Sequence, residues 1–279
     1  MEIIFQHVTS HYRILHDINL TIPLGQIVAV CGHTGSGKST LLKHMNGLMI
    51  PGKGIIKIGN FVIKPGQPQK SLKALRKHIG MVFQFPESQL FAETVAEDIS
   101  FAPIQFGFSK KEAFKLTKAV MTEVGLSHEL LSKSPFSLSG GQKRLVAIAG
   151  VLVTGPDVLL LDEPAAGLDP IAHQKIMNLL ADWHKKRNMT MIFITHDMDD
   201  AARYADEMVI MKNGEIAYKG KTREVFSNEQ LLKETSLSYP SALKFQRLLE
   251  EHSGHPLPIN CLTAGELAEQ LILYRNKHR

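Results

Sequence analysis

The chain has 279 residues, of which 44% are hydrophobic and 21% are charged. This length and composition allow a sizeable core and exclude a disordered or fibrous protein. The 32 basic and 27 acidic residues leave a net charge of +5, which singles out neither nucleic acid nor an anionic membrane as a partner. We expect no membrane span and no signal peptide, because no uncharged run forms an uninterrupted apolar helix. The two cysteines argue against a disulfide framework and favour a reducing compartment.

The first 83 residues alternate short apolar runs with turn residues, a pattern typical of β-strands. The dipeptide Gly59-Asn60 between two such runs predicts a hairpin. The expected elements are strands around residues 3–8, 18–22, 27–30 and 79–83, a hairpin over 54–58 and 61–63, and a helix over 38–47.

The pattern turns helical from about residue 92 to residue 150, where Ser109 and Glu112 form a capping-box motif. Strands and helices then alternate, which predicts an α/β fold with a parallel sheet covered by helices. We expect strands over 158–161, 191–194 and 208–211, helices over 171–187 and 197–204, and two more helices near 241–252 and 264–276.

Residues 32–39, with the sequence GHTGSGKS, fit the P-loop pattern and lie between an apolar strand and a helix. Glycines let the backbone turn tightly, so that successive N–H groups point at phosphate oxygens, and the helix N-terminus adds positive potential. Lys38 would reach the β- and γ-phosphates of a nucleotide, and Ser39 would ligate Mg²⁺. The residues expected to hold the nucleotide here are Gly32, His33, Thr34, Gly35, Ser36, Gly37, Lys38, Ser39 and Thr40.

A second apolar strand, residues 158–161, ends in Asp162 and Glu163. Ligands of parallel sheets bind beyond the carboxyl ends of the strands, which places both carboxylates near the P-loop. Asp162 would hold the Mg²⁺ shell, and Glu163 would polarise a water in line with the γ-phosphate. Together with the P-loop, this strand makes nucleotide hydrolysis the leading hypothesis.

Residues 137–142, with the sequence SLSGGQ, open a predicted helix. Ser139 is a good N-cap, and Gly140 and Gly141 leave backbone N–H groups bare, as in an anion-binding helix terminus. Taken alone, however, this helix start favours an ordinary capped helix over an anion site.

The motifs occur in the order found in ATP-binding cassette (ABC) ATPases, and over roughly residues 1–225 the chain resembles that family. The ordered set is the P-loop, Gln84, residues 138–142 (LSGGQ), Asp162-Glu163, residues 167–169 (GLD) and His196. Within the family, residues 83–91 (FQFPESQLF) and 162–170 (DEPAAGLDP) are similar to the second, or A-prime, ATPase of energy-coupling factor (ECF) transporters.

The resemblance implies a P-loop ABC core with a mixed or parallel sheet, an N-terminal antiparallel β subdomain and a helical signature subdomain over about residues 86–152. The nucleotide-binding domain would cover residues 1–225, and a small helical extension residues 226–279. ATP and Mg²⁺ would bind between two ATPase subunits that complete each other's sites.

The resemblance also implies roles for individual residues of this chain. Lys38, Gln84, Glu163 and His196 would be catalytic, and Mg²⁺ would be held by Ser39, Gln84 and Asp162. His196 would contact the γ-phosphate, Tyr12 would stack on the adenine, and Asp169 would link the two ATP sites. The residues expected to bind the ATP held by the partner's P-loop are Ser139, Gly140, Gly141 and Gln142. For Tyr12, an aromatic ring that packs in the core or faces solvent is the alternative.

The function implied is that of an ATPase at the cytoplasmic face of the membrane that powers an ECF importer for vitamins or other micronutrients. Another ABC importer, such as a cobalt or nickel system, and a soluble ABC protein outside transport are the alternatives. The implied partners are a second related ATPase, a substrate-binding membrane subunit and a transmembrane coupling subunit that contacts residues 84–98, with no nucleic acid. Four carboxylates near that segment either pair with arginines of the coupling subunit or form a solvated acidic face: Glu87, Glu93, Glu97 and Asp98.

Overall fold

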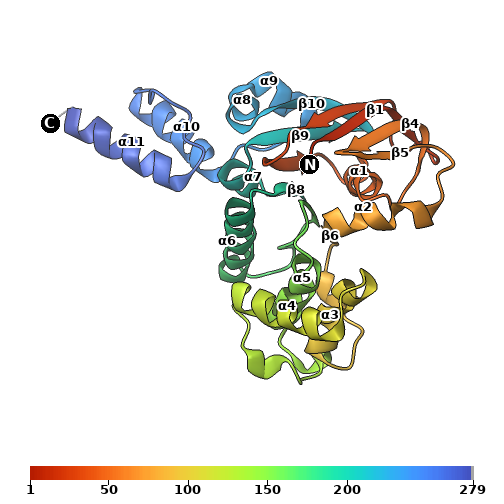
Figure 1. Cartoon of the computed structure of the whole chain (residues 1–279). Coiled ribbons are helices and arrows are strands. Elements are labelled where there is room, and N and C mark those ends of the chain that lie inside the picture. Colours follow the sequence, from red (N-terminus) through yellow and green to blue (C-terminus); the bar gives the residue numbers. More distant parts are fainter. Residues whose placement is uncertain (278–279) are drawn as a thin grey trace.

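The structure is a computed structural model and describes residues 1–277. Two β-sheets and a helical region form the body of the molecule, and two C-terminal helices stand away from it (Figure 1). This arrangement confirms the predicted α/β fold class.

The N-terminal part of the chain forms a small antiparallel sheet with the strand order β2-β1-β4-β5. In β2, buried and exposed residues alternate, as the two-residue period of a strand requires. β4 and β5 pair in antiparallel fashion, which confirms the predicted hairpin. The bounds are β1 (Ile3–Ser10), β2 (Ile18–Ile22), β4 (Pro51–Ile58) and β5 (Phe61–Ile63).

The larger sheet has the strand order β10-β9-β3-β8-β7-β6. The strands from β9 to β6 in this order pair in parallel, which confirms the predicted parallel sheet. Their bounds are β3 (Ile27–Cys31), β6 (Ile79–Val82), β7 (Val158–Asp162), β8 (Thr190–Ile194) and β9 (Glu207–Lys212).

The sequence pattern does not predict β10 (Glu215–Lys221). This edge strand returns antiparallel to β9 through Asn213 and Gly214, whose φ angles are 50° and 80°. Two consecutive positive φ angles suit a two-residue hairpin turn, and the Asn-Gly dipeptide is the sequence signal for one.

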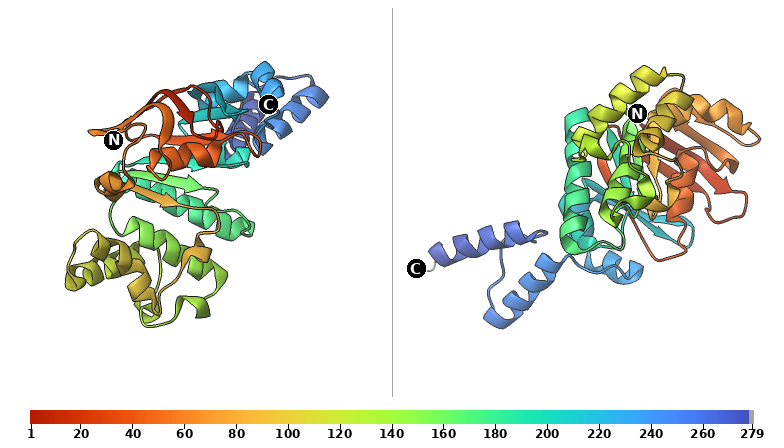
Figure 2. Two further views of the ribbon diagram at one scale, coloured as in Figure 1. Left: turned by 90° about the vertical axis from the view of Figure 1, so that its right-hand side faces the viewer. Right: turned by 90° about the horizontal axis from the view of Figure 1, so that it is seen from below.

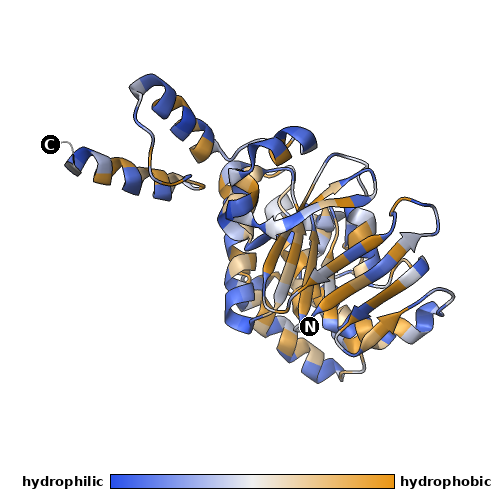
Figure 3. Cartoon of the chain, turned by 90° about the horizontal axis from the view of Figure 1, so that it is seen from above, coloured by the Kyte–Doolittle hydropathy of each residue, from blue (hydrophilic) through white to orange (hydrophobic). Residues whose placement is uncertain are grey.

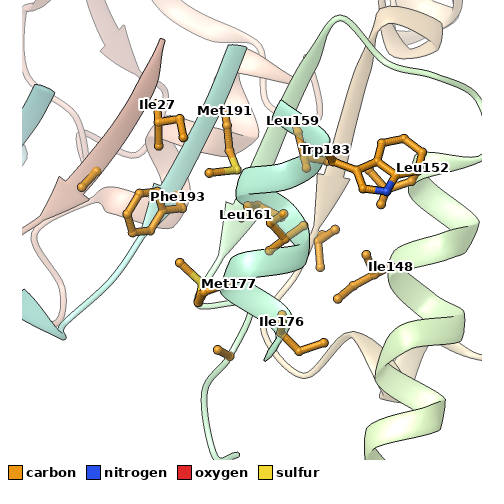
Figure 4. Packing of buried hydrophobic residues seen from close by; sticks show 14 of the residues in the cluster. Ile27, Ile148, Leu152, Leu159, Leu161, Ile176, Met177, Trp183, Met191 and Phe193 are labelled. Carbon is orange, nitrogen blue, oxygen red and sulfur yellow. The ribbon is translucent and has the colours of Figure 1, made fainter. Parts of the chain in front are cut away.

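Hydrophobic side chains on the two faces of the larger sheet enter two separate core clusters. In β7, Leu159 and Leu161 belong to the cluster that contains residues of α6 (Pro170–Arg187), whereas Leu160 belongs to the cluster shared with the small sheet. Figure 4 shows α6 between the sheet and α5 (Gly140–Leu152), with side chains from all three entering one cluster. This packing fixes the start of α6 relative to the strand that ends at Asp162.

The helical region contains α3 (Val95–Gln105), α4 (Lys110–Glu123) and α5, and it lies on the opposite side of the larger sheet from the small sheet (Figures 1 and 2). The predicted cap of α4 is present, because Ser109 Oγ accepts a hydrogen bond of 3.3 Å from the backbone N of Glu112. Near the two sheets lie α1 (Lys38–Met45), α2 (Lys73–His78), α7 (Met198–Tyr204), α8 (Thr222–Ser227) and α9 (Glu229–Thr235).

The two predicted C-terminal helices, α10 (Ser241–Ser253) and α11 (Ala264–Lys277), project from the body of the molecule (Figure 2). The backbone N and Oγ of Ser241 donate hydrogen bonds of 2.7 and 2.6 Å to the carboxylate of Asp199 in α7. Arg223 of α8 donates a hydrogen bond of 2.6 Å to Glu266 of α11. Residue 225, the expected end of the nucleotide-binding domain, lies within α8, and the division of the chain into domains stays a prediction.

Apolar residues are concentrated in the strands of the sheets, whereas most helices carry both polar and apolar residues (Figure 3). Within the described part of the chain, no helix combines the length and the hydropathy needed to cross a bilayer.

Candidate nucleotide-binding site

The P-loop turns between the end of β3 and the start of α1 in a conformation that favours glycine. Gly32, Gly35 and Gly37 have φ angles of 142°, 82° and 101°, which residues with a side chain rarely adopt. At Gly32, a Cβ would lie 2.2 Å from the backbone oxygen of Met211. The backbone itself therefore requires glycines at these positions of the motif.

The side chain of Lys38 lies along the P-loop. Its Nζ donates hydrogen bonds of 2.7 Å to the backbone oxygens of Gly32 and His33. Burial lowers the pKa of Lys38, and the carboxylate of Glu163 opposes this shift. Backbone carbonyls lack the full charge of a phosphate, so an anion bound at the loop would compete for the ammonium group. In the same loop, Ser36 Oγ is buried and has no hydrogen-bond partner among the described residues.

Glu163 stands between side chains that come from the two neighbouring strand ends. It directly follows β7 and has a φ of 49°. Gln84 Nε2 donates a hydrogen bond of 3.1 Å to Glu163 Oε2, and His196 Nε2 lies 3.1 Å from Glu163 Oε1. Gln84 follows β6 and His196 follows β8. Because β6, β7 and β8 are adjacent and parallel, their carboxyl ends bring the three side chains to one edge of the sheet.

The P-loop and these strand ends line one cavity of about 650 Å³, a volume within the range of ligand pockets. Ile14 also lines it, whereas the predicted aromatic residue, Tyr12, does not. The predicted residues that line the cavity are Thr34, Gly35, Gly37, Lys38, Ser39, Thr40, Gln84, Asp162, Glu163 and His196. Gly32 and His33 line a smaller adjoining cavity, together with His196.

Other predicted ligand residues lie outside the P-loop cavity of their own chain. Tyr12 is 82% exposed. Ser139 caps α5, because its Oγ accepts a hydrogen bond of 3.4 Å from Gln142 N and its backbone N donates one of 3.2 Å to the Gln142 side chain. A Cβ on Gly140 or Gly141 would meet no neighbouring element within 4 Å. Within residues 1–277, therefore, the signature segment 138–142 is an open helix start that does not line this cavity.

Asp169 has a local role within the chain. Its Oδ1 accepts hydrogen bonds of 3.0 Å from the backbone N atoms of Ile171 and Ala172. These contacts cap α6, and the residue is exposed at the surface.

Glu87, one of the four carboxylates near the segment proposed to contact a coupling subunit, is paired within the chain. Both of its carboxylate oxygens accept hydrogen bonds from Arg144, at 2.7 and 2.9 Å. Arg144 is 3% exposed and also donates a hydrogen bond of 2.7 Å to the backbone oxygen of Ala166. These hydrogen bonds lower the pKa of Glu87. A buried guanidinium requires acceptors, and the sequence analysis did not single out Arg144 as needing one.

Two more carboxylates of this segment are engaged within the chain. Glu97 accepts a hydrogen bond of 3.2 Å at the start of α3, and Asp98 accepts hydrogen bonds of 3.0 Å from the backbone N atoms of Phe91 and Ala92. Glu93 is exposed and, among the described residues, makes no ion pair or side-chain hydrogen bond. Of the four carboxylates, Glu93 is the most accessible to another molecule.

A P-loop that faces a strand-end carboxylate pair defines the class of P-loop nucleoside triphosphatases. A family model described as ABC transporter matches residues 15–166. The ECF transporter ATP-binding protein EcfA2 of Bacillus licheniformis is 50% identical over 257 residues, which are 92% of this chain and 89% of that protein. Proteins of the same name are 51% identical in Bacillus subtilis, covering 92% of this chain and 93% of that protein, and 48% identical in Listeria welshimeri, covering 95% and 92%.

Solved structures agree with these relatives. CbiO1 of Clostridium perfringens, described as part of the ABC transporter complex cbiONQ, has a TM-score of 0.74 at 36% identity and covers 89% of this chain and 98% of its own. A dimeric structure of the ATP-binding cassette MJ0796 with ADP and Pi has a TM-score of 0.71 at 30% identity, covering 79% and 99%. The chain therefore belongs to the ABC transporter family of ATPases and, within it, to the ATP-binding proteins of ECF transporters. The predictions of fold, family and ATPase activity are confirmed.

Proposed function

We propose that this chain binds ATP with Mg²⁺ in the P-loop cavity and hydrolyses it with Glu163 as the activating carboxylate, to power an ECF importer. The observation that carries this proposal is the position of Glu163, which contacts Gln84 and His196 at the edge of the cavity. Lys38 lines the same cavity, so the group that binds phosphate and the group that polarises water face one space.

The chain's own residues have distinct proposed roles. The backbone N–H groups of residues 32–40 and the ammonium of Lys38 bind the phosphates. Glu163 polarises the attacking water as a general base, Gln84 orients that water, and His196 contacts the γ-phosphate. Catalysis of this kind is mainly positioning and charge neutralisation around the γ-phosphate.

The donor set at the cavity fits a magnesium ion. Ser39, Gln84 and Asp162 line the same space, and each offers an oxygen atom, the ligand type that Mg²⁺ prefers. Asp162 is buried, and among residues 1–277 its carboxylate makes no hydrogen bond or salt bridge, which suits a group reserved for a cation. When bound, Mg²⁺ supplies charge neutralisation on the phosphates.

In this proposal, the signature segment 138–142 completes the ATP site of a second, related ATPase. The signature segment of that partner completes the P-loop site of this chain. The support for this proposal is an exposed helix start with bare glycines, which is suited to phosphate. The relative MJ0796 is described as dimeric. In such a pair, the exposed Asp169 links the two sites, and Tyr12 stacks on the adenine beside Ile14.

A transmembrane coupling subunit is the proposed partner for residues 84–98, at the cytoplasmic face of the membrane. Glu93 is accessible there, and Phe91 packs edge to face on Phe101 with both rings exposed. The relative cbiO1 is described as part of a transporter complex. A further membrane subunit recognises the cargo, a vitamin or another micronutrient, and nucleic acid has no part in this function.

The variant Glu163→Gln tests the proposed function. It keeps the shape of the side chain but removes the carboxylate, so we expect ATP still to bind while turnover at this site falls at least about hundredfold. The measurement is steady-state hydrolysis at saturating ATP, with nucleotide binding in parallel, on the full-length chain and the subunits that purify with it. Glu215→Gln, on the exposed edge strand β10, is the matched control. A rate near wild type in Glu163→Gln would show that another group activates the water.

A further inference from the structure

A second cavity, of about 200 Å³, shares Glu163 and His196 with the P-loop cavity. The segment that follows Glu163, residues 164–168, lines it, and so do His173 and Asp200. The loops after β7 and β8 therefore meet around this cavity. A contact on its wall is in a position to affect the Glu163–His196 pair.

Two helices continue from those loops. α6 begins after Asp169 and carries His173 in its first turn, where the backbone N of His173 donates a hydrogen bond of 2.9 Å to the backbone oxygen of Asp169. α7 begins after Asp197, the residue that follows His196, and carries Asp200 in its first turn. The two first turns are thus direct extensions of the catalytic loops.

His173 and Asp200 join these first turns. His173 Nε2 lies 2.8 and 2.9 Å from the two carboxylate oxygens of Asp200. An ionised carboxylate only accepts hydrogen bonds, so His173 is the donor. Asp200 is 8% exposed, and His173 is its only side-chain hydrogen-bond partner among the described residues. Burial raises the pKa of Asp200, and the hydrogen bond from His173 opposes that shift.

A second contact between the same helices lies farther from the loops. Tyr204 donates a hydrogen bond of 2.8 Å to the side-chain oxygen of Asn178. Met177 of α6 and Ala201 of α7 also share one hydrophobic cluster. The packing of α7 near α6 is therefore also stabilised by contacts other than His173–Asp200. The His173–Asp200 contact differs from them because it lies beside the loops of Glu163 and His196.

We propose that His173 is a positioning residue for ATP hydrolysis, because through Asp200 it holds the loop of His196 against the loop of Glu163. This inference rests on the roles proposed above for Glu163 and His196. Without His173, the buried carboxylate of Asp200 loses its partner, which is costly. It then turns towards solvent and draws the start of α7 with it, so that the 3.1 Å contact between His196 and Glu163 lengthens.

The effect falls on turnover rather than on ATP binding, because within residues 1–277 no residue of α6 or α7 lines the P-loop cavity. His173→Ala should lower the turnover number roughly tenfold or more, as small misplacements near reacting atoms do, while the KM for ATP changes less than about twofold. His173→Arg keeps a cationic donor for the carboxylate and should stay within about twofold of wild type. Asn178→Ala, the matched control, removes the distant contact and should also stay within about twofold.

The test is steady-state ATP hydrolysis by the full-length chain with the subunits that purify with it. Because a partner ATPase has a second site that keeps turning over, the turnover of this chain's own site is taken as the wild-type rate minus the rate of Glu163→Gln, and the fold-changes given for His173 and Asn178 refer to that difference. The proposal would be overturned if the turnover number of His173→Ala stays within about twofold of wild type. It would also be overturned if Asn178→Ala loses as much turnover, or if only the KM for ATP changes in His173→Ala. If His173→Ala fails to fold, Asp200→Asn removes the charge without changing the shape, and its turnover number is expected to fall with the same unchanged KM. Glu163→Gln is measured alongside. If it retains turnover, the proposed function is wrong; if it loses turnover while His173→Ala keeps it, only the positioning role is wrong.

Discussion

Arg144 joins three segments of the chain, two of which follow residues that line the P-loop cavity, Gln84 and Glu163. It belongs to α5, its guanidinium binds both carboxylate oxygens of Glu87, and it also donates to the backbone oxygen of Ala166. Glu87 follows Gln84 in the chain, and Ala166 follows Glu163. A guanidinium can serve a carboxylate and a carbonyl at once because its five donors lie in a fixed plane. The buried guanidinium of Arg144 therefore holds the loop after Gln84 and the loop after Glu163 against α5.

The variant Glu87→Gln tests this buried pair through stability. It leaves Arg144 without its counter-charge, so we expect the free energy of unfolding at pH 7 to fall by about 1–3 kcal/mol. The pKa of Glu87 in the folded chain is lowered from its ordinary value of 4.5 by the hydrogen bonds from Arg144. The stabilisation is therefore present above pH 4.5 and is lost as the pH falls through the lowered pKa.

Urea unfolding of wild type and variant at pH 7 and at decreasing pH below 4.5 measures the difference. The gap between them should narrow as the pH falls, because Gln does not titrate. Glu93→Gln, which removes an exposed carboxylate without a partner, should stay within about 0.5 kcal/mol of wild type at every pH. A gap that is absent at pH 7, or that stays constant with pH, would contradict the role of the pair.

At the scale of single residues, the sequence predicted what local motifs determine. Glu163, Gln84 and His196 each follow a strand of one parallel sheet, so their meeting is a consequence of topology. The pairing of Glu87 with Arg144 joins positions 57 residues apart, and neither local pattern specifies the other. For that reason, the sequence did not distinguish Glu87 from the other three carboxylates of its segment.

At the scale of elements, the sequence pattern predicted the buried strands, the long helices, the hairpin strand β5 and the helix α7, but it missed the short helices α8 and α9 and the edge strand β10. α8 and α9 have 6 and 7 residues, so a helical pattern has little room to repeat, and neither follows a strand in the βαβ alternation that indicated α7. β10 pairs with β9 alone and carries no fully buried residue, so hydropathy gives it a weak signal. The Asn213-Gly214 turn was the usable indication of its presence.

Asp199 provides one of the contacts that attach α10 to the rest of the chain, beside an ion pair between Arg247 and Glu229 of α9 and the burial of Leu243 in the main hydrophobic cluster. Asp199 of α7 accepts hydrogen bonds from the backbone N and Oγ of Ser241 at the start of α10. Ser241→Ala removes the hydroxyl bond, a loss of about 1 kcal/mol, so amide exchange in the first turn of α10 should accelerate about fivefold. Native-state hydrogen exchange checks this, with Lys244→Ala on the exposed side of α10 as the control. Unchanged exchange in Ser241→Ala would show that the hydroxyl bond to Asp199 does not hold the first turn of α10.

At the scale of the whole molecule, the two halves of the ATP site lie in different places. Lys38 and Glu163 line the P-loop cavity, whereas Ser139 caps the exposed start of α5 in the helical region. A single chain thus presents one phosphate-binding loop and, separately, one bare helix start. This separation is the structural support for a site shared between two ATPase subunits, and it is the central claim for this molecule.

Two substitutions in this chain damage the P-loop and the signature segment separately. Lys38→Ala removes the ammonium group of this chain's P-loop. Ser139→Asp keeps the helix cap, since Asp caps as well as Ser, but it places a negative charge against the phosphates of a partner's ATP. Ser109→Asp at the cap of α4 is the matched control and should leave turnover unchanged.

The shared site is tested by steady-state ATP hydrolysis of the purified assembly with Lys38→Ala, Ser139→Asp or both in this chain. In a pair with a related ATPase, each single variant damages one of two sites and the double variant damages both, so we expect the double variant to lose the turnover that each single variant retains. If the chain pairs with itself, a mixture of the two single variants should recover turnover that neither shows alone. A double variant as active as Lys38→Ala, or a mixture that stays inactive, would contradict the shared site.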